Sequence, residues 1–274
     1  MGDPVKDVIA DLIGKAPSGI DPRNVVREYL QGRILESLQR AGAMVPLAFM
    51  GGTALRFLYR TPRYSEDLDF SLEREPGVYD LGGWLRRVRQ DLTAESYDVE
   101  IALKSGRSVD AARVAFPRLL FELGLSAHPA EKLMVKLEVD THPPAGAGLE
   151  VTLVRRATIT LRLQHHDRES LLAGKINALL SRDWLKGRDV YDLVWYLADA
   201  DWPSPNLVLL NNALAQFDSG VGPLAPATWR SAARDRLAGA DWNALRADVR
   251  PFLERPDDIA IVSEGSLQQV LRPE

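Results

Sequence analysis

The segment from Phe49 to Leu72, FMGGTALRFLYRTPRYSEDLDFSL, constrains the fold of this chain most. It opens with an apolar run that ends at Met50 and is typical of a buried strand. Two consecutive glycines, Gly51 and Gly52, then break the strand, and Thr53 is a candidate cap for a short helix. A proline-containing loop leads into a run that alternates strictly between polar and apolar residues. The segment therefore predicts a strand, a short helix and a second strand.

The second of these strands presents two carboxylates on one face. Asp67 and Asp69 are two residues apart in the alternating run, so their side chains project from the same side. Two negative charges this close repel each other unless a cation lies between them, and Mg²⁺ prefers oxygen ligands. The glycines upstream leave backbone N–H groups accessible at a helix start, where phosphate binds. The pattern indicates a site for a nucleoside triphosphate and magnesium; the alternative is a hairpin with solvated aspartates.

The glycine turn, the helix and the Asp-x-Asp strand together resemble the nucleotidyltransferase superfamily shared with DNA polymerase beta. More narrowly, GGTALR followed by RYSEDLDF is similar to the AbiEii/AbiGii toxin family, which includes the MenT toxins. The separation between Gly52 and Asp67 is longer than in the smallest superfamily members but usual for this narrower family. The resemblance implies a nucleotidyltransferase-type mixed sheet flanked by helices.

A second stretch, GKINALLSRDWLKGRDVYDLVWYL, carries the same resemblance. Family members have a lysine on one helix and an Arg-Asp-x-x-Asp-Leu sequence that opens the next helix. Lys175 matches the lysine that contacts the triphosphate, and Asp189 matches an aspartate of the active site, with Asp192 as its neighbour. From the residues alone, Lys175 is interpreted as a surface lysine, and Asp189 as an acidic charge favoured at a helix N-terminus.

A further strand with a polar face is predicted from Lys132 to Thr141, KLMVKLEVDT. We expect that face to lie beside Asp67 and Asp69. In the wider superfamily a neighbouring strand supplies a third carboxylate to the metal, and Asp140 is the candidate here. The alternative is that Asp140 ends the strand and prepares the turn that follows at 142–144.

The composition excludes several kinds of site. The 274 residues include no cysteine, which excludes disulfides, thiolate zinc sites and thiol nucleophiles.

A net charge of −4 gives no support by itself to a nucleic-acid partner, so any basic surface has to be local. The N-terminus is too charged for a signal peptide and no apolar run reaches membrane-spanning length. We expect a cytoplasmic protein with no membrane partner.

The order of elements predicts an α+β fold: a nucleotidyltransferase-like α/β domain at 1–163, then a helical C-terminal domain at 164–274 that contributes to the active site. Asp21-Pro22 is typical of a helix start, with Asp as the cap and Pro at the first helical position. The other elements on which the argument depends are a helix at 80–95 and strands at 98–104 and 111–125.

These patterns lead to the hypothesis of a Mg²⁺-dependent nucleotidyltransferase with NTP as substrate. The resemblance implies transfer to an RNA end, typically the tRNA acceptor, which blocks translation. It also implies a bacterial toxin–antitoxin or phage-defence system with the antitoxin encoded beside the toxin. Two alternatives stay open: nucleotidylation of a protein or small molecule, and a non-catalytic nucleotide-binding module. The candidate residues are Asp67, Asp69, Lys175 and Asp189 for catalysis; Gly51, Gly52, Thr53, Ser65 and Lys175 for the nucleotide; and Asp67, Asp69 and Asp140 for the metal. Ser65 is included on its position alone, which also makes it a candidate phosphorylation site.

Overall fold

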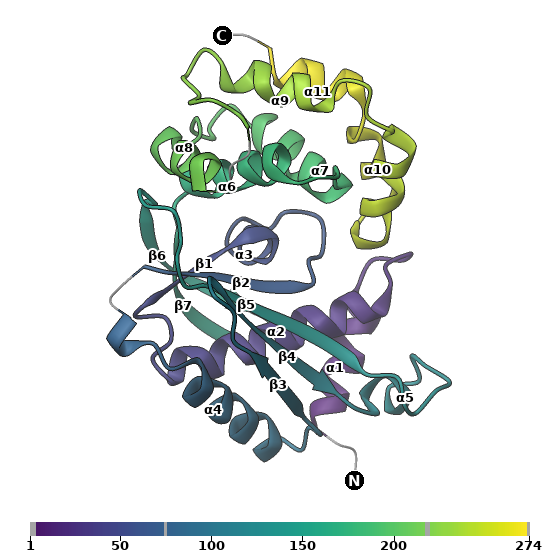
Figure 1. Ribbon diagram of the computed structural model, residues 1–274. Helices are drawn as coiled ribbons and strands as arrows, with labels where there is room; N and C mark the ends of the chain where they lie inside the picture. The colour runs from purple at the N-terminus through teal and green to yellow at the C-terminus, as the bar shows by residue number, and fades with distance from the viewer. Residues whose placement is uncertain (1–3, 74–75, 217–219, 273–274) are drawn as a thin grey trace. The chain divides into compact units, whose positions relative to one another are not determined.

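The computed structural model describes residues 4–73, 76–216 and 220–272. The chain forms two compact units. Unit 1 comprises 1–60, 64–142 and 151–165, and unit 2 comprises 61–63, 143–150 and 166–274. A seven-stranded mixed sheet with helices is the basis of unit 1, and the C-terminal part of the chain is helical (Figure 1). The predicted α+β fold class is confirmed.

The sheet has the strand order β3-β4-β5-β2-β1-β7-β6. Parallel pairing joins β2 to β5 and β1 to β7, whereas β1–β2, β3–β4 and β4–β5 are antiparallel. Neighbouring strands such as β2 and β5 are thus far apart in the sequence. The strands are β1 (Leu47–Met50), β2 (Asp67–Leu72), β3 (Glu100–Lys104), β4 (Val109–Phe116), β5 (Leu133–Asp140), β6 (Leu149–Arg156) and β7 (Ile159–His166).

The helices of unit 1 include two long ones, α2 and α4, that pack against each other (Figure 1). Asp21 caps α2 as predicted, because its side chain accepts a hydrogen bond of 2.9 Å from the backbone N–H of Arg23. The Ser37 hydroxyl on α2 donates to Asp91 on α4 at 2.7 Å. These helices are α1 (Pro4–Lys15), α2 (Pro22–Arg40), α3 (Gly51–Tyr59), α4 (Leu81–Ala94), α5 (Leu119–Glu122) and the 3₁₀ turn Pro76–Val78.

The start of α3 differs from the prediction. The helix begins at Gly51, and Met50 occupies the cap position without a side-chain hydrogen bond. The prediction that Thr53 caps the helix is therefore wrong, and its buried hydroxyl donates instead to the carbonyl oxygen of Asp67. The physical reason is the backbone of Gly51, whose φ of +78° lets the chain turn directly from strand into helix.

The predicted strand at 111–125 is also wrong in its second half. The strand β4 ends at Phe116, and the short helix α5 begins at Leu119. Pro117 has no N–H to continue the ladder, and Arg118 adopts a left-handed φ of 61° that turns the chain out of the sheet.

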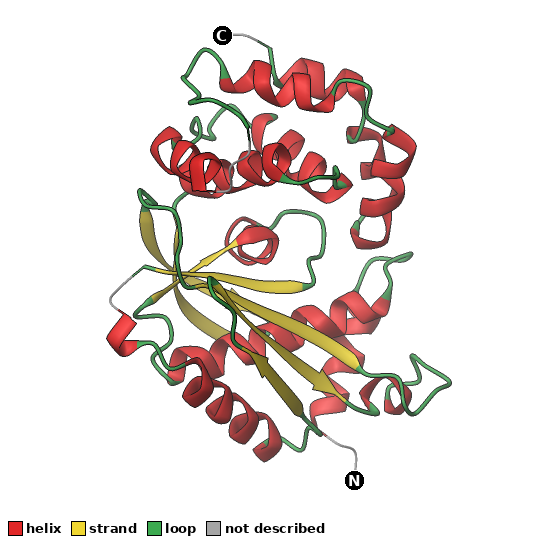
Figure 2. Cartoon of the chain, viewed as in Figure 1, coloured by secondary structure: helices red, strands yellow, loops and turns green. Residues whose placement is uncertain are grey.

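The regular elements described in unit 2 after β7 are helices (Figure 2). The side chain of Asp167 caps α6 by accepting from the N–H of Ser170 at 2.8 Å. A Cβ at Gly187 would lie 1.8 Å from the carbonyl oxygen of Leu245, so only glycine lets α7 approach α10 this closely. The helices are α6 (Arg168–Ser181), α7 (Gly187–Leu197), α8 (Leu207–Gln216), α9 (Trp229–Leu237), α10 (Trp242–Val249) and α11 (Glu264–Val270), with 3₁₀ turns at Arg250–Phe252 and Pro256–Ile261. Within the residues that the structure describes, no helix combines the length and the apolarity needed to span a bilayer.

A buried glutamine connects α2 to the backbone that enters β2. Gln31 on α2 is 1% exposed, and its Nε2 donates to the carbonyl oxygens of Ser65 at 3.0 Å and Glu66 at 2.9 Å. One side chain thus satisfies two carbonyl groups directly before the strand that carries Asp67.

We expect Gln31→Leu to lower the free energy of unfolding by about 1–3 kcal/mol, because it leaves both carbonyl groups without this donor. Urea denaturation followed by circular dichroism measures the change. Gln90→Leu, at an exposed position of α4, is the control and should change the value by less than about 0.5 kcal/mol. Equal effects of the two substitutions would contradict the role given to Gln31.

Candidate functional site

The acidic face of β2 meets a polar face of β5. In the parallel register Asp67 lies opposite Lys136, and Asp69 lies opposite Glu138. The prediction that the polar side of the 132–141 strand lies beside Asp67 and Asp69 is confirmed. Glu138 was not among the predicted site residues, although its place in the same alternating run was a signal for it.

Lys136 supplies positive charge within this cluster. Its Nζ lies 2.8 Å from Oε1 of Glu138. The hydrogen bond to Glu138 raises the pKa of Lys136; burial opposes the rise, and the charges of Glu138, Asp67 and Asp69 add to it. The lysine is therefore held in its charged form beside three carboxylates. We call Asp67, Asp69, Lys136 and Glu138 the acidic cluster.

The glycine turn lies directly against the acidic cluster. A Cβ at Gly51 would lie 2.3 Å from Oδ2 of Asp69, so a side chain there would collide with the carboxylate. Gly51, Gly52 and Thr53 form the first turn of α3, whose N–H groups have no partner within the helix. A helix start that favours anions is thus held beside carboxylates that favour cations.

This arrangement fits a magnesium-bound triphosphate better than a metal bound by protein alone. Among the residues that the structure describes, no three His, Cys, Asp or Glu side chains are grouped so as to hold a metal. Mg²⁺ typically uses one or two carboxylates and completes its shell with substrate phosphates and water. The half-buried Asp67 and Asp69 provide the carboxylates, and the α3 N-terminus provides a place for phosphate.

Asp140 and Ser65 lie at the margins of the acidic pair: Asp140 is two residues beyond Glu138, the residue opposite Asp69, and Ser65 is two residues before β2 begins. Asp140 is opposite Ser71 in the register, and its Oδ1 accepts a 2.9 Å hydrogen bond from the N–H of His142. Burial raises the pKa of Asp140, against the effect of His142. This is the geometry of a strand-end aspartate, and its role as a metal ligand stays a prediction. Ser65 precedes β2, and its carbonyl oxygen accepts from Gln31.

Unit 2 contains a second cluster of charges, centred on Lys175 of α6. The Nζ of Lys175 lies 2.7 Å from Oδ2 of Asp192 and 3.4 Å from Oδ1 of Asp189, both on α7. Arg63 donates through two nitrogens to both carboxylate oxygens of Asp192. Asp189 accepts in addition from Arg182. We call these five residues the α6–α7 charge cluster.

Asp192 is the most buried carboxylate of this cluster, with no exposed surface. Burial alone would raise the pKa of Asp192, but the positive charges of Arg63 and Lys175 outweigh it and hold the pKa below its ordinary value. The structure therefore brings Lys175 together with both predicted aspartates and places Asp192 closer than Asp189. Arg63 escaped the sequence analysis because it lies 129 residues from Asp192. Arg182 carried no pattern that distinguished it from other surface arginines.

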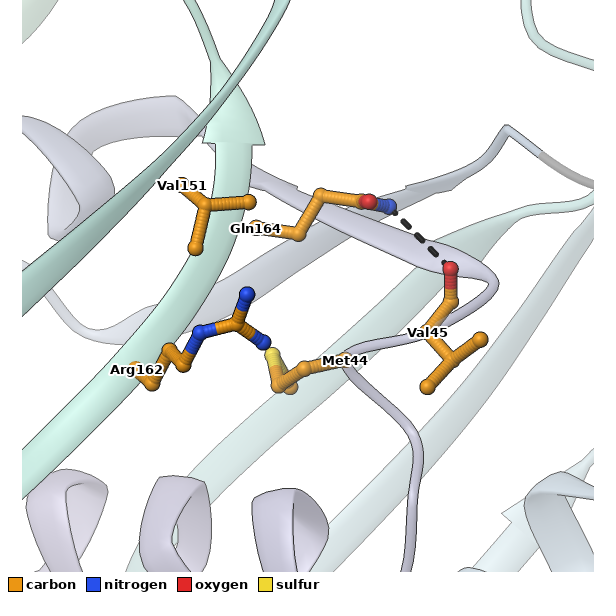
Figure 3. A pocket seen from close by; sticks show the side chains of 5 residues that line it. All are labelled: Met44, Val45, Val151, Arg162 and Gln164. Carbon is orange, nitrogen blue, oxygen red and sulfur yellow. Dashed lines mark hydrogen bonds between the residues drawn. The ribbon is translucent and has the colours of Figure 1, made fainter.

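A cavity elsewhere in unit 1 is lined by none of the predicted site residues (Figure 3). It has a volume of about 160 Å³, and its Gln164 donates to the carbonyl oxygen of Val45 at 3.3 Å. The lining residues are Met44, Val45, Val151, Arg162 and Gln164. The cavity offers no carboxylate, so the acidic cluster stays the candidate metal site of unit 1.

Comparison with known proteins identifies a matching family and two solved structures of similar fold. The family model described as "Nucleotidyl transferase AbiEii toxin, Type IV TA system" matches residues 33–264, a range that includes both clusters. Two solved structures from Helicobacter pylori are similar in fold. One is JHP933, with a TM-score of 0.54, 18% identity, and 92% of this chain and 93% of that chain covered. The other is described as a "putative nucleotidyltransferase", with a TM-score of 0.51, 20% identity, and 90% and 93% covered. No curated protein matches the chain.

We expect Asp192→Asn to lower the free energy of unfolding by about 3–5 kcal/mol at pH 7, because Arg63 loses its buried counter-charge. The pKa of Asp192 is lower in the folded chain than in the unfolded chain, where it lies near 3.8. The contribution of the Asp192 carboxylate to the free energy of unfolding is therefore complete above about pH 4. It is lost as the pH falls through the lower pKa that Asp192 has in the folded chain.

Urea denaturation of both proteins between pH 7 and pH 3 tests this prediction. The difference in the free energy of unfolding between the wild type and Asp192→Asn should stay constant down to about pH 4 and become smaller below it. Asp201→Asn, an exposed position of unit 2, is the matched control and should behave like the wild type. A difference that grows on acidification would contradict the assignment.

We expect Lys136→Met to tighten binding of Mn²⁺, used as a spectroscopic substitute for Mg²⁺, by several fold, because a competing positive charge is removed from beside Asp67 and Asp69. Electron paramagnetic resonance of free Mn²⁺ measures the affinity. Lys132→Met is the control, since its side chain is 42% exposed against 41% for Lys136 and pairs with Glu100. Unchanged or weaker binding in Lys136→Met would count against this role.

Proposed function

Because the chain belongs to the AbiEii family of nucleotidyltransferase toxins of type IV toxin–antitoxin systems, we propose that it transfers a nucleotide from NTP to an RNA end in a Mg²⁺-dependent reaction. The observation that carries the proposal is the contact of the glycine turn with the acidic pair: the start of α3 and Asp69 are so close that Gly51 has no room for a side chain. A phosphate site and a cation site thus adjoin in one strand–helix–strand unit.

Each part of this unit has a role in the proposed reaction. Asp67 and Asp69 would hold the metal, which would supply Lewis-acid stabilisation of the negative charge on the triphosphate. The N–H groups of Gly51, Gly52 and Thr53 hold phosphate oxygens. Asp140 is proposed as the third carboxylate and acceptor of the proton from the attacking hydroxyl. Glu138 is a second candidate for the third carboxylate, because it lies opposite Asp69.

The α6–α7 charge cluster serves the same reaction in this proposal. Lys175 neutralises negative charge that develops on the triphosphate. Asp189 and Asp192 both contact its ammonium group, which supports a role for them in orienting it. Arg63 stabilises the charge of the buried Asp192 and in this way positions Lys175 indirectly.

A tRNA acceptor end is the RNA that we propose as the acceptor, with arrest of translation as the consequence. A type IV toxin implies an antitoxin as its counterpart. We propose that this antitoxin is encoded beside the toxin, that the pair acts in phage defence, and that the toxin acts in the cytoplasm, where NTP and RNA are available.

A transfer assay tests the proposal. Purified protein is incubated with Mg²⁺, each labelled NTP in turn and total tRNA, and the products are separated on a denaturing gel. We expect label in RNA with the wild type, and a loss of roughly 100-fold or more in Asp67→Asn, Asp69→Asn and Lys175→Met. Combining Asp69→Asn with Lys175→Met should cost much less than the product of the single effects, because groups that serve one step are not additive.

Controls separate loss of chemistry from loss of fold. Thermal unfolding of Asp67→Asn and Asp69→Asn should stay close to the wild type. Lys175→Met is assayed below its lowered unfolding temperature, because it removes one of the two cations that contact the buried Asp192. Lys132→Met should retain full transfer, since Lys132 pairs with Glu100. Comparison of Glu138→Gln with Asp140→Asn identifies the third carboxylate. Label that enters protein or a small molecule while RNA stays unlabelled would reject the RNA acceptor. Tight NTP binding without any transfer would indicate a non-catalytic module.

A further inference from the structure

Trp184, in the loop between α6 and α7, is 63% exposed. The structure describes all six tryptophans of the sequence, and the other five are buried or half-buried: Trp84, Trp195, Trp202, Trp229 and Trp242. Leaving a large apolar ring in water is costly, since burying such a side chain stabilises a protein by about 1.5–3 kcal/mol. An exposed tryptophan on a loop is therefore a candidate contact for a partner.

The loop that carries Trp184 is anchored on both sides. Before Trp184, the Arg236 guanidinium donates to the carbonyl oxygens of Arg182 at 2.8 Å and Asp183 at 3.5 Å. After it, Gly187 packs so closely on Leu245 that a Cβ would have no space. The ring is thus presented on a positioned backbone, which lowers the entropy cost of binding a partner.

The segment that carries the ring is rich in cationic residues. Residues 182–188, RDWLKGR, contain three cationic residues and one acidic residue, although the whole chain carries −4. Two of these cations already contact acids, because Arg182 bonds to Asp189 and Arg188 lies 3.8 Å from Asp248. An aromatic face beside cationic side chains is the combination that binds single-stranded nucleic acid.

The same loop is connected to the α6–α7 charge cluster. Arg182 lies two residues before Trp184 and bonds to Asp189, which in turn contacts Lys175. Trp184 is therefore two residues away in the chain from a member of the cluster that the proposed reaction uses. Stacking on an exposed ring does not require a particular base, since every base of a single-stranded nucleic acid has a π-face.

We propose that Trp184 stacks on an unpaired base of the acceptor RNA and so positions the strand end. The choice of RNA rests on the proposed function, whereas the stacking contact rests on the exposure, anchoring and charge of the loop. Trp184 is a positioning residue in this inference and takes no part in bond making.

Binding to two RNA hairpins tests the inference without chemistry. One hairpin carries a four-nucleotide unpaired 3′ extension and the other is blunt. Fluorescence anisotropy is measured on the full-length protein without NTP or Mg²⁺. We expect Trp184→Ala to weaken binding of the extended hairpin about tenfold, within the range for one stacked base, and to leave the blunt hairpin unchanged. Trp184→Phe should stay within about threefold of the wild type, because it keeps an aromatic face.

Three controls belong to the experiment. Val208→Ala removes an equally exposed side chain of unit 2, 64% exposed, and should bind both hairpins like the wild type. Acrylamide quenching of the wild type minus that of Trp184→Phe isolates the emission of Trp184, which the extended hairpin should shield. Thermal unfolding of Trp184→Ala should match the wild type, because the ring is exposed.

The outcomes separate this inference from the proposed function. Binding of the extended hairpin by Trp184→Ala within twofold of the wild type overturns the inference, and so does an equal loss for the blunt hairpin. A loss confined to NTP binding also overturns it, because the stacked base would then belong to the nucleotide. Binding of the extended hairpin that depends on Trp184, without transfer of label to RNA, supports the inference while the proposed function fails. Transfer of label to RNA that does not depend on Trp184 supports the proposed function, while the inference about Trp184 fails.

Discussion

Repulsion between Asp67 and Asp69 is the constraint on which the acidic cluster depends. Two carboxylates on one strand face need positive charge nearby, and the parallel pairing of β2 with β5 brings Lys136 opposite Asp67. The pKa of Lys136 rises in response to Glu138 and to both aspartates. The carboxylates of the acidic cluster attract cations, and the ammonium group of Lys136 compensates part of their negative charge.

The α6–α7 charge cluster follows the same electrostatic rule with buried groups. Asp192 has no exposed surface, so its charge is tolerable only because Arg63 and Lys175 both contact it. Lys175 is in turn held by two carboxylates. Positive and negative groups thus alternate through the cluster, which fixes the ammonium group in place. The ammonium group of Lys175 is therefore oriented by contacts within the protein itself.

Backbone geometry connects the glycine turn to this chemistry. Gly51 adopts a φ of +78° and lies so close to Asp69 that a Cβ would be 2.3 Å from its carboxylate. Glycine is required there for two independent reasons, conformation and space. The turn also starts α3 at Gly51, three residues earlier than a cap at Thr53 would, so that three N–H groups of the first turn follow the strand directly.

Inspection of the residues alone predicts the local features: the strict alternation around Asp67 and Asp69, the glycine break before them, the Asp21 cap and the α+β order of elements. Alternation and capping are local properties of neighbouring residues, so the sequence displays them directly. Two further features emerge only in the folded chain: Glu138 rather than Asp140 lies opposite Asp69, and Arg63 pairs with Asp192 across 129 residues. Strand register and contacts between distant segments depend on how the whole chain packs, and no local pattern records them.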